Sequence, residues 1–164
     1  MQYMKLDPDQ REEFLISLAS MPAYLDEVFS RLSPEQTRTV AADGTLSPVE
    51  QVWHLADLER EGFGERIRRL LTEKEPYLPD FDGAKLAAER DYRRLTLEDG
   101  LAAFAEARRR NLAALRSIDG QAWFLSGTQD GVGKVSLCDI PGFMSQHDGS
   151  HKAEIEAWMK SAGQ

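Results

Sequence analysis

The chain of 164 residues contains only three histidines, His54, His147 and His151, and the last two are four residues apart. A four-residue step along a helix turns by about 40° and rises about 6 Å, so these two imidazoles project side by side from one face. Neutral imidazole is the commonest nitrogen ligand of divalent metals in proteins. The pair is therefore a candidate metal-binding motif.

The histidine pair falls within the apolar stripe of its predicted helix. On a helical wheel the residues within roughly 80° of His147 are Ile140, Phe143, Met144, His151, Glu154, Ile155 and Trp158. Burying an imidazole without a partner costs a few kcal/mol, so each ring needs a metal, a backbone carbonyl or an acidic side chain. On the pair alone, a metal site and two hydrogen-bonded core histidines are both open.

His54 has a different setting, on an earlier predicted helix. Its close neighbours on the wheel are Glu50, Asp57 and Glu61, and the main apolar stripe of that helix lies on the opposite side. The pattern therefore predicts that His54 is a boundary residue exposed to solvent.

Four long amphipathic segments must position these residues. Helix-start signals and apolar spacings of three and four predict helices over residues 7–32, 47–71 and 96–118, and from Ser136 or Asp139 to about Lys160. Pro22 should divide the first. Residues 84–94 can hold a short helix, and residues 127–133 read as a loop. We expect an all-α four-helix bundle with long connections, at least one crossing the bundle, as one domain over residues 1–164.

The composition is that of an acidic globular chain, with 41% hydrophobic residues and a net charge of −8. The acidic balance argues against nucleic acid as a partner. No run of about 18 apolar residues is present, which argues against a membrane span. No secretory signal is visible, and the single cysteine, Cys138, fits a reducing compartment. We expect a cytoplasmic protein.

The order of several short motifs resembles a known family. Residues 52–59 read Val-Trp-His-Leu-Ala-Asp-Leu-Glu, Phe104 is followed by Arg108, and Trp123 precedes a Gly-containing loop and the His-Asp-x-x-His motif of residues 147–151. This arrangement over about residues 8–160 resembles the DinB/YfiT-like family of small bacterial metal-binding four-helix bundles.

The resemblance implies a divalent metal held by His54, His147 and His151, with His54 turned inward by a kinked or splayed helix. Three nitrogen ligands leave a coordination position open, which is typical of catalytic sites. Zn, Ni, Fe and Cu all suit such ligands. The family implies a small-molecule substrate, a homodimer, and either transfer reactions of a low-molecular-weight thiol or hydrolysis. The alternative is a non-catalytic stress or regulatory protein, or a bundle with a vestigial site.

Several further residues of the sequence have more than one possible role. Glu154 could accept a hydrogen bond from an imidazole, ligate the metal, act as a general base, or form an ion pair at the bundle edge. Asp148 is expected to face solvent, Arg108 to form an exposed salt bridge rather than bind an anionic substrate, and Cys138 to be inert. Pro141 should delay the start of the last helix to about Ile140.

Overall fold

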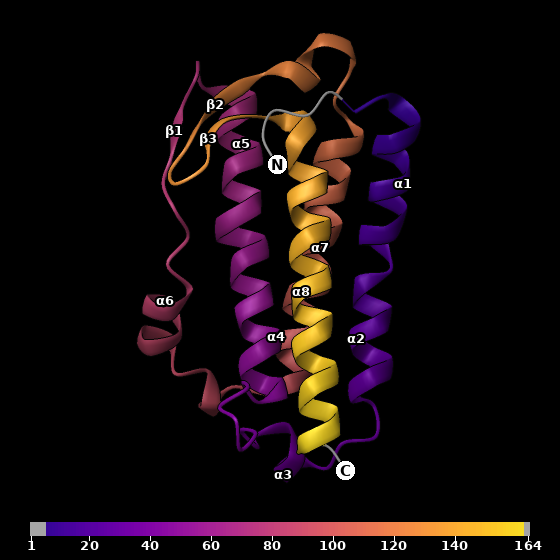
Figure 1. The fold of residues 1–164 in the computed structure, drawn as a ribbon, viewed down its shortest axis with the longest axis vertical. Coiled ribbons are helices and arrows are strands. Elements are labelled where there is room, and N and C mark those ends of the chain that lie inside the picture. Colours follow the sequence, from indigo (N-terminus) through magenta and orange to yellow (C-terminus); the bar gives the residue numbers. More distant parts are fainter. Residues whose placement is uncertain (1–5, 163–164) are drawn as a thin grey trace.

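The structure is a computed structural model that describes residues 6–162, and four long helical segments stand side by side in it (Figure 1). These segments are α1 (Pro8–Ala19) with α2 (Met21–Phe29), α4 (Pro48–Asp57) continued by the π-helical η1 (Leu58–Phe63) and α5 (Gly64–Thr72), α7 (Leu97–Arg116), and α8 (Ile140–Ser161). The predicted four-helix bundle is confirmed. The shorter helices are α3 (Pro34–Thr37), α6 (Gly83–Arg90), η2 (Tyr92–Arg94), η3 (Gly120–Phe124) and η4 (Leu137–Asp139).

The helices begin where the sequence predicts. The side chains of Asp7, Ser47 and Thr96 each accept a hydrogen bond from a backbone N–H in the first turn of the following helix. Pro22 lies in the first turn of α2, so it divides the first segment as expected. Pro141 likewise lies in the first turn of α8, where a missing N–H costs no helical hydrogen bond.

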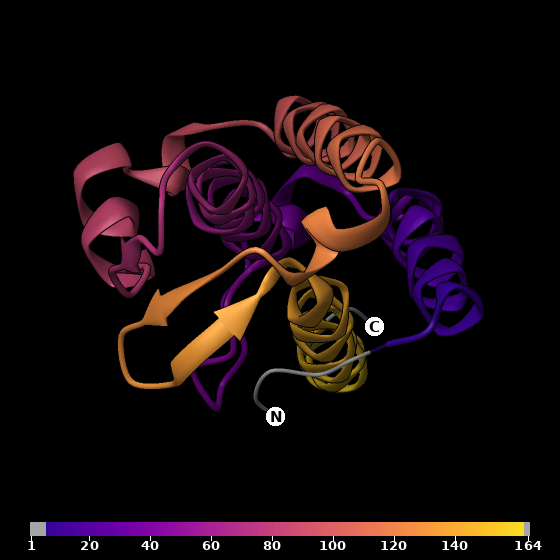
Figure 2. The same ribbon diagram turned by 90° about the horizontal axis from the view of Figure 1, so that it is seen from above.

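The chain does not fold as a simple up-and-down bundle. The connection between α5 and α7 returns along the whole length of the bundle, so α4–α5 and α7 run in the same direction (Figure 1). Seen from above, the four long helical segments surround a common interior (Figure 2). The expected crossing connection is therefore residues 73–96, and it lies against α4 through α6 and η2.

A small sheet at one end of the bundle was not expected from the sequence. It consists of β1 (Tyr77–Leu78), β2 (Ser126–Gln129) and β3 (Gly133–Ser136), with β1 parallel and β3 antiparallel to β2. The predicted loop over residues 127–133 is therefore wrong, because it is most of a β-hairpin. Strands of two to four residues are too short to show an alternating pattern. The hairpin projects beside α8 on the side away from α1 (Figure 2).

Two apolar clusters fill the interior. One gathers residues of α1, α5, the sheet and the start of α8, and the other gathers residues of α2, α4 and the end of α8. On α7, Arg108 falls between Phe104 of the second cluster and Leu115 of the first. No helix within residues 6–162 combines the length and the apolar character needed to cross a membrane.

Candidate metal centre

The structure brings the three histidines together from two helical segments. The ring centroids of His54 and His151 are 5.2 Å apart, and those of His147 and His151 are 6.2 Å apart. His151 is buried, His54 is half-buried, and His147 is exposed beside the hairpin. The pair predicted on the last helix thus shares one face, but only His151 belongs to the interior.

The prediction that His54 is exposed is wrong, and the returning connection explains why. Residues 73–96 cover the face of α4 that the helical wheel assigned to solvent. A Cβ atom at Gly83 would lie 2.8 Å from Cε1 of His54, so only glycine allows α6 to begin this close to the ring. The ring of Phe81 also packs at 6.3 Å from that of His54. A helical wheel considers one helix alone, so it could not show that residues 73–96 pack over this face of α4.

All three imidazoles favour the neutral form. Burial lowers the pKa of His54, although the charges of Glu154 and Asp57 partly oppose this. Partial burial and the charges of Arg66 and His54 lower the pKa of His147. Burial and the neighbouring histidines lower the pKa of His151 to about 4. Neutral imidazole is the form that ligates a metal, so the local environment suits that task.

His151 has polar partners on the side of its Nδ1 atom. Nε2 of Gln51 lies 3.2 Å from His151 Nδ1 and donates to Oε2 of Glu154 at 2.9 Å. The same Glu154 oxygen is 3.6 Å from His151 Nδ1. Oε1 of Gln51 is buried without a partner among the described residues. A carboxylate beside one imidazole nitrogen is the usual arrangement that orients a metal-ligating histidine through the other nitrogen.

The three histidines match a divalent ion in chemistry but do not form a closed cage. Within residues 6–162, no three His, Cys, Asp or Glu side chains lie close enough together to hold an ion as they stand. The three rings are nevertheless neighbours through His151, and they are all the histidines of the chain. The Gln51 amide and the Glu154 carboxylate lie beside Nδ1 of His151. The chemistry of the donor set, three neutral imidazoles with a carboxylate nearby, is of the kind that divalent metals bind.

A buried ion-pair cluster lies directly beneath this centre. Arg108, with 2% of its surface exposed, donates to both oxygens of Asp148 at 2.8 and 2.9 Å and to Oε1 of Glu59 at 2.9 Å. It also donates to the carbonyl of Leu18. Burial acts to lower the pKa of Arg108, but the Asp148 hydrogen bond and both carboxylate charges raise it overall.

This cluster corrects two predictions. Asp148 does not face solvent, and Arg108 does not form an exposed salt bridge, because each supplies the charge that the other needs for burial. Asp148 stands between the two histidines of α8, so Arg108 fixes the rotation of that helix. Glu59 is the second residue of the π-helical segment η1, and Asn111 donates to both its carbonyl and its carboxylate. The second long helix does contain a π-helical turn, but it begins at Leu58, after His54, so that the expected inward turn of His54 by a distorted helix stays a prediction.

An open cleft begins at His147. It measures about 680 Å³ and is lined by Phe63, Arg66, Gln129, Gly131, Val132, Phe143, Gln146 and His147. The rings of Phe63 and His147 meet edge to face at 5.4 Å between centroids. Its volume lies in the usual range for small-molecule sites, about 300–1,000 Å³. The exposed histidine of the centre therefore faces a space that a substrate can enter.

Comparisons with known proteins agree with this architecture. Residues 17–155 match the model of the DinB superfamily. The chain belongs to the DinB superfamily. A solved structure, YfiT from Bacillus subtilis, superposes with a TM-score of 0.86 over 97% of this chain and 93% of that one, at 23% identity. YfiT is described as a probable metal-dependent hydrolase with an unusual four-helix bundle topology. No protein with a curated description is significantly similar to the chain.

Sequence reasoning missed several residues of this DinB bundle. Gln51 lies one helical turn before His54, and that spacing alone places it on the same side of α4. Arg66 and Gln129 carry no local signal, because their place in the cleft depends on how the hairpin docks beside α5 and α8. Cys138 is buried against the backbone of Leu6, and its inert role stays a prediction.

Proposed function

We propose that this DinB superfamily member is a metal-dependent enzyme, a hydrolase, whose divalent ion (Zn, Ni or Fe) is bound by His54, His147 and His151. The observation that carries the proposal is the proximity of these three side chains, one of which, His147, lines a cleft. Three nitrogen ligands leave room for a further ligand, as in catalytic rather than structural sites. The description of YfiT as a probable metal-dependent hydrolase supports the same reaction class.

The residues of this chain would prepare the site in two ways. An ion held by these residues would supply Lewis-acid activation of water or a thiol. Lowered pKa values keep the three imidazoles neutral and available at pH 7. Gln51 donates from Nε2 to Glu154 and lies 3.2 Å from Nδ1 of His151, with the Glu154 carboxylate 3.6 Å from the same nitrogen, so these two side chains would hold the His151 ring in place.

Glu154 is the predicted catalytic residue, and its surroundings favour a positioning role. Its carboxylate reaches Gln51 and His151, while half of the side chain remains exposed. A positioning residue changes metal affinity, whereas a general base changes the pH dependence of turnover. Measuring both for Glu154→Gln separates the two roles.

Thiol-dependent S-transfer is a second candidate. The cleft of about 680 Å³ has room for a low-molecular-weight thiol beside an electrophile, and the same open centre would serve both reactions. A homodimer, which the family resemblance implies, stays a prediction that sedimentation velocity tests.

Metal content is the first test. The purified protein should contain about one divalent ion per chain, and His54→Ala, His147→Ala and His151→Ala should each lower it, whereas Ser150→Ala on the same helix should not. Chelation should abolish hydrolysis of a chromogenic ester, or consumption of a bacterial thiol with an electrophile, and the metal should restore it. Unchanged metal content in all three histidine variants would refute the centre. Metal binding without any turnover would favour the non-catalytic alternative.

A further inference from the structure

Arg66 is a buried cation without a bonded partner. Only 7% of its surface is exposed, and no hydrogen bond or ion pair joins it to another residue within 6–162. Its guanidinium group makes a cation–π contact with the Phe63 ring, whose centroid lies 5.6 Å from the guanidinium carbon. Burial lowers the pKa of Arg66, and the charge of Asp80 opposes this only in part. A desolvated charge is costly unless something pairs with it.

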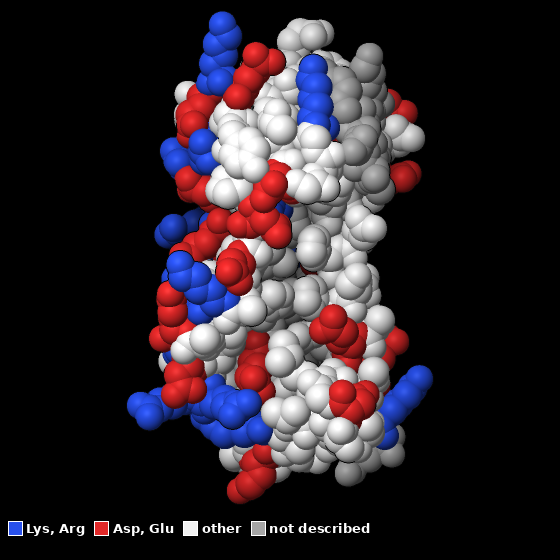
Figure 3. All heavy atoms as spheres, turned by 60° about the vertical axis from the view of Figure 1, so that its left-hand side comes forward, with Lys and Arg blue, Asp and Glu red and all other residues white. Residues whose placement is uncertain are grey.

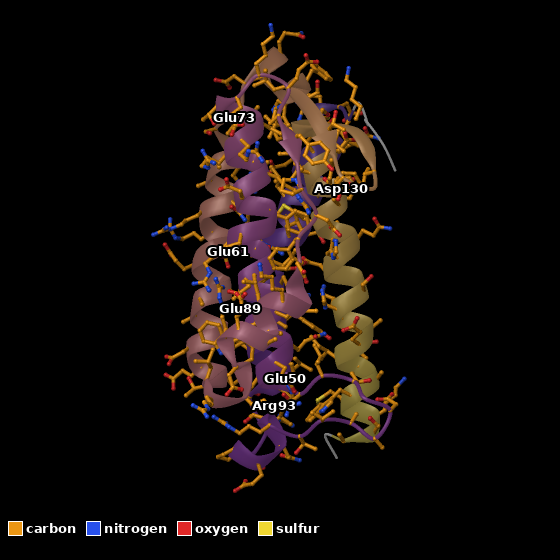
Figure 4. The ribbon with its side chains drawn as sticks, turned by 90° about the vertical axis from the view of Figure 1, so that its left-hand side faces the viewer. Glu50, Glu61, Glu73, Glu89, Arg93 and Asp130 are labelled. Atoms are coloured by element: carbon orange, nitrogen blue, oxygen red, sulfur yellow. The ribbon has the colours of Figure 1, made fainter. Side chains whose placement is uncertain are left out.

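Arg66 lines two cavities, one rich in charged side chains and one with few. One, of about 370 Å³ between α5 and α6, has acidic side chains along its wall, and Glu61 and Glu89 of this wall are labelled in Figure 4. The other is the cleft at His147, where Arg66 is the only Lys, Arg, Asp or Glu among the lining residues. Figure 3 shows charged side chains of both signs crowded along the side of the molecule that carries α5 and α6. An anion is therefore attracted to the histidine side.

Two further residues of the cleft suit a bound anion. Gln129 is 9% exposed, and its Oε1 is buried without a partner among the described residues, so its amide is free to turn and donate. The Phe63 ring contacts both the Arg66 guanidinium and the His147 ring, which places the cation beside the metal centre. Asp130, next to Gln129 and labelled in Figure 4, is not among the lining residues of the cleft, and its carboxylate raises the pKa of Tyr77 instead.

We propose that the cleft binds an oxyanionic group of the substrate, a carboxylate or a phosphate, through the guanidinium of Arg66 and the amide of Gln129. Guanidinium presents paired donors that match two oxygens of such a group. This proposal rests on the proposed function in one respect: the substrate bond that the enzyme cleaves would lie between the bound anion and the histidines. Anion binding itself needs no metal.

The test uses small aromatic probes and the full chain after chelation. Benzoate and phenyl phosphate should bind, benzyl alcohol should not, and the tighter of the two anions identifies the oxyanion class. Chemical shifts of the Gln129 side-chain amide and the Gly131 N–H report binding inside the cleft. Arg66→Gln should weaken anion binding at least tenfold, whereas Arg68→Gln, an exposed arginine two residues away that pairs with Glu65, should change it less than twofold.

Three controls keep this proposal separate from the metal centre. Arg66→Gln should retain the wild-type metal content, and its melting temperature should not fall, because it removes an unpaired buried charge. Arg66→Lys should bind anions with intermediate strength. Equal anion binding by wild type and Arg66→Gln, or no anion binding by wild type, would overturn the proposal. Anion binding that requires added metal and survives Arg66→Gln would assign the anion to the histidine centre instead, which also overturns it.

Discussion

The substitution Arg108→Met tests the buried ion-pair cluster beneath the histidines. Methionine retains much of the length of the arginine stem but removes the four hydrogen bonds to Leu18, Glu59 and Asp148. Two carboxylates then share a buried environment without their cation, since the side chains of Glu59 and Asp148 are only 2% and 10% exposed. Removing one partner of a buried ion pair typically costs about 3–5 kcal/mol.

Glu59 and Asp148 do not lose the same number of hydrogen bonds in Arg108→Met, and this difference sets the expected loss of stability. Glu59 keeps the hydrogen bond from Asn111 at 2.9 Å, whereas Asp148 loses both bonds to the guanidinium. We therefore expect a loss of about 4 kcal/mol in the free energy of unfolding at pH 7.5. A carboxylate without its cation binds a proton more readily in the folded than in the unfolded chain, so the loss should shrink as the pH falls to 5.

Urea unfolding followed by circular dichroism measures both effects. The matched control is Arg109→Met, the next residue, which is 67% exposed, pairs with Glu106, and should change stability by less than about 1 kcal/mol. Adding Asp148→Leu to Arg108→Met should recover stability, because it removes the stranded charge. A loss below about 1 kcal/mol for Arg108→Met, or a larger loss independent of pH, would refute the role assigned to the cluster.

Three further predictions concern the surroundings of the centre. Gly83→Val should lower metal affinity at least tenfold in a chelator competition, because its Cβ would lie 2.8 Å from Cε1 of His54, and wild-type affinity would show that α6 does not position the ring. Tyr92→Phe removes a donor to buried Asp57 and should cost about 1–3 kcal/mol in urea unfolding; no change would mean that the remaining arginine bonds suffice. In the metal-free protein the pKa of His151 is lowered to about 4, so the unfolded chain protonates first and stability should fall by about 2 kcal/mol from pH 7 to 5. Stability that rises on acidification would contradict this direction.

The helices could be predicted because their signals are local. Asp7, Ser47 and Thr96 each cap the helix that follows within three residues, and the apolar spacing is read from neighbours on one helix. The shared face of His147 and His151 follows from helical geometry alone. Local signals therefore predicted the bundle and two of the three proposed metal ligands.

The errors share a physical cause, which is a partner distant in the sequence. Asp148 is buried because Arg108, 40 residues earlier, neutralises it, and His54 is covered because Gly83 lets α6 approach. A helical wheel treats every face outside the apolar stripe as solvent, so it misplaces any charged residue that is paired in the interior. The family resemblance placed His54 in the centre because it carried this distant information.

Arg66 and Arg108 show why burial alone does not indicate what an arginine does. Both are nearly inaccessible to solvent, but Arg108 has two carboxylates and a carbonyl as partners, whereas Arg66 has none that bonds to it among the described residues. The first arrangement stabilises the fold, and its removal should be costly. The second arrangement lowers stability, and a protein tolerates such a cost where a ligand compensates for it. Arg108→Met should therefore lower stability, Arg66→Gln should not, and of the two only Arg66→Gln should change anion binding in the cleft.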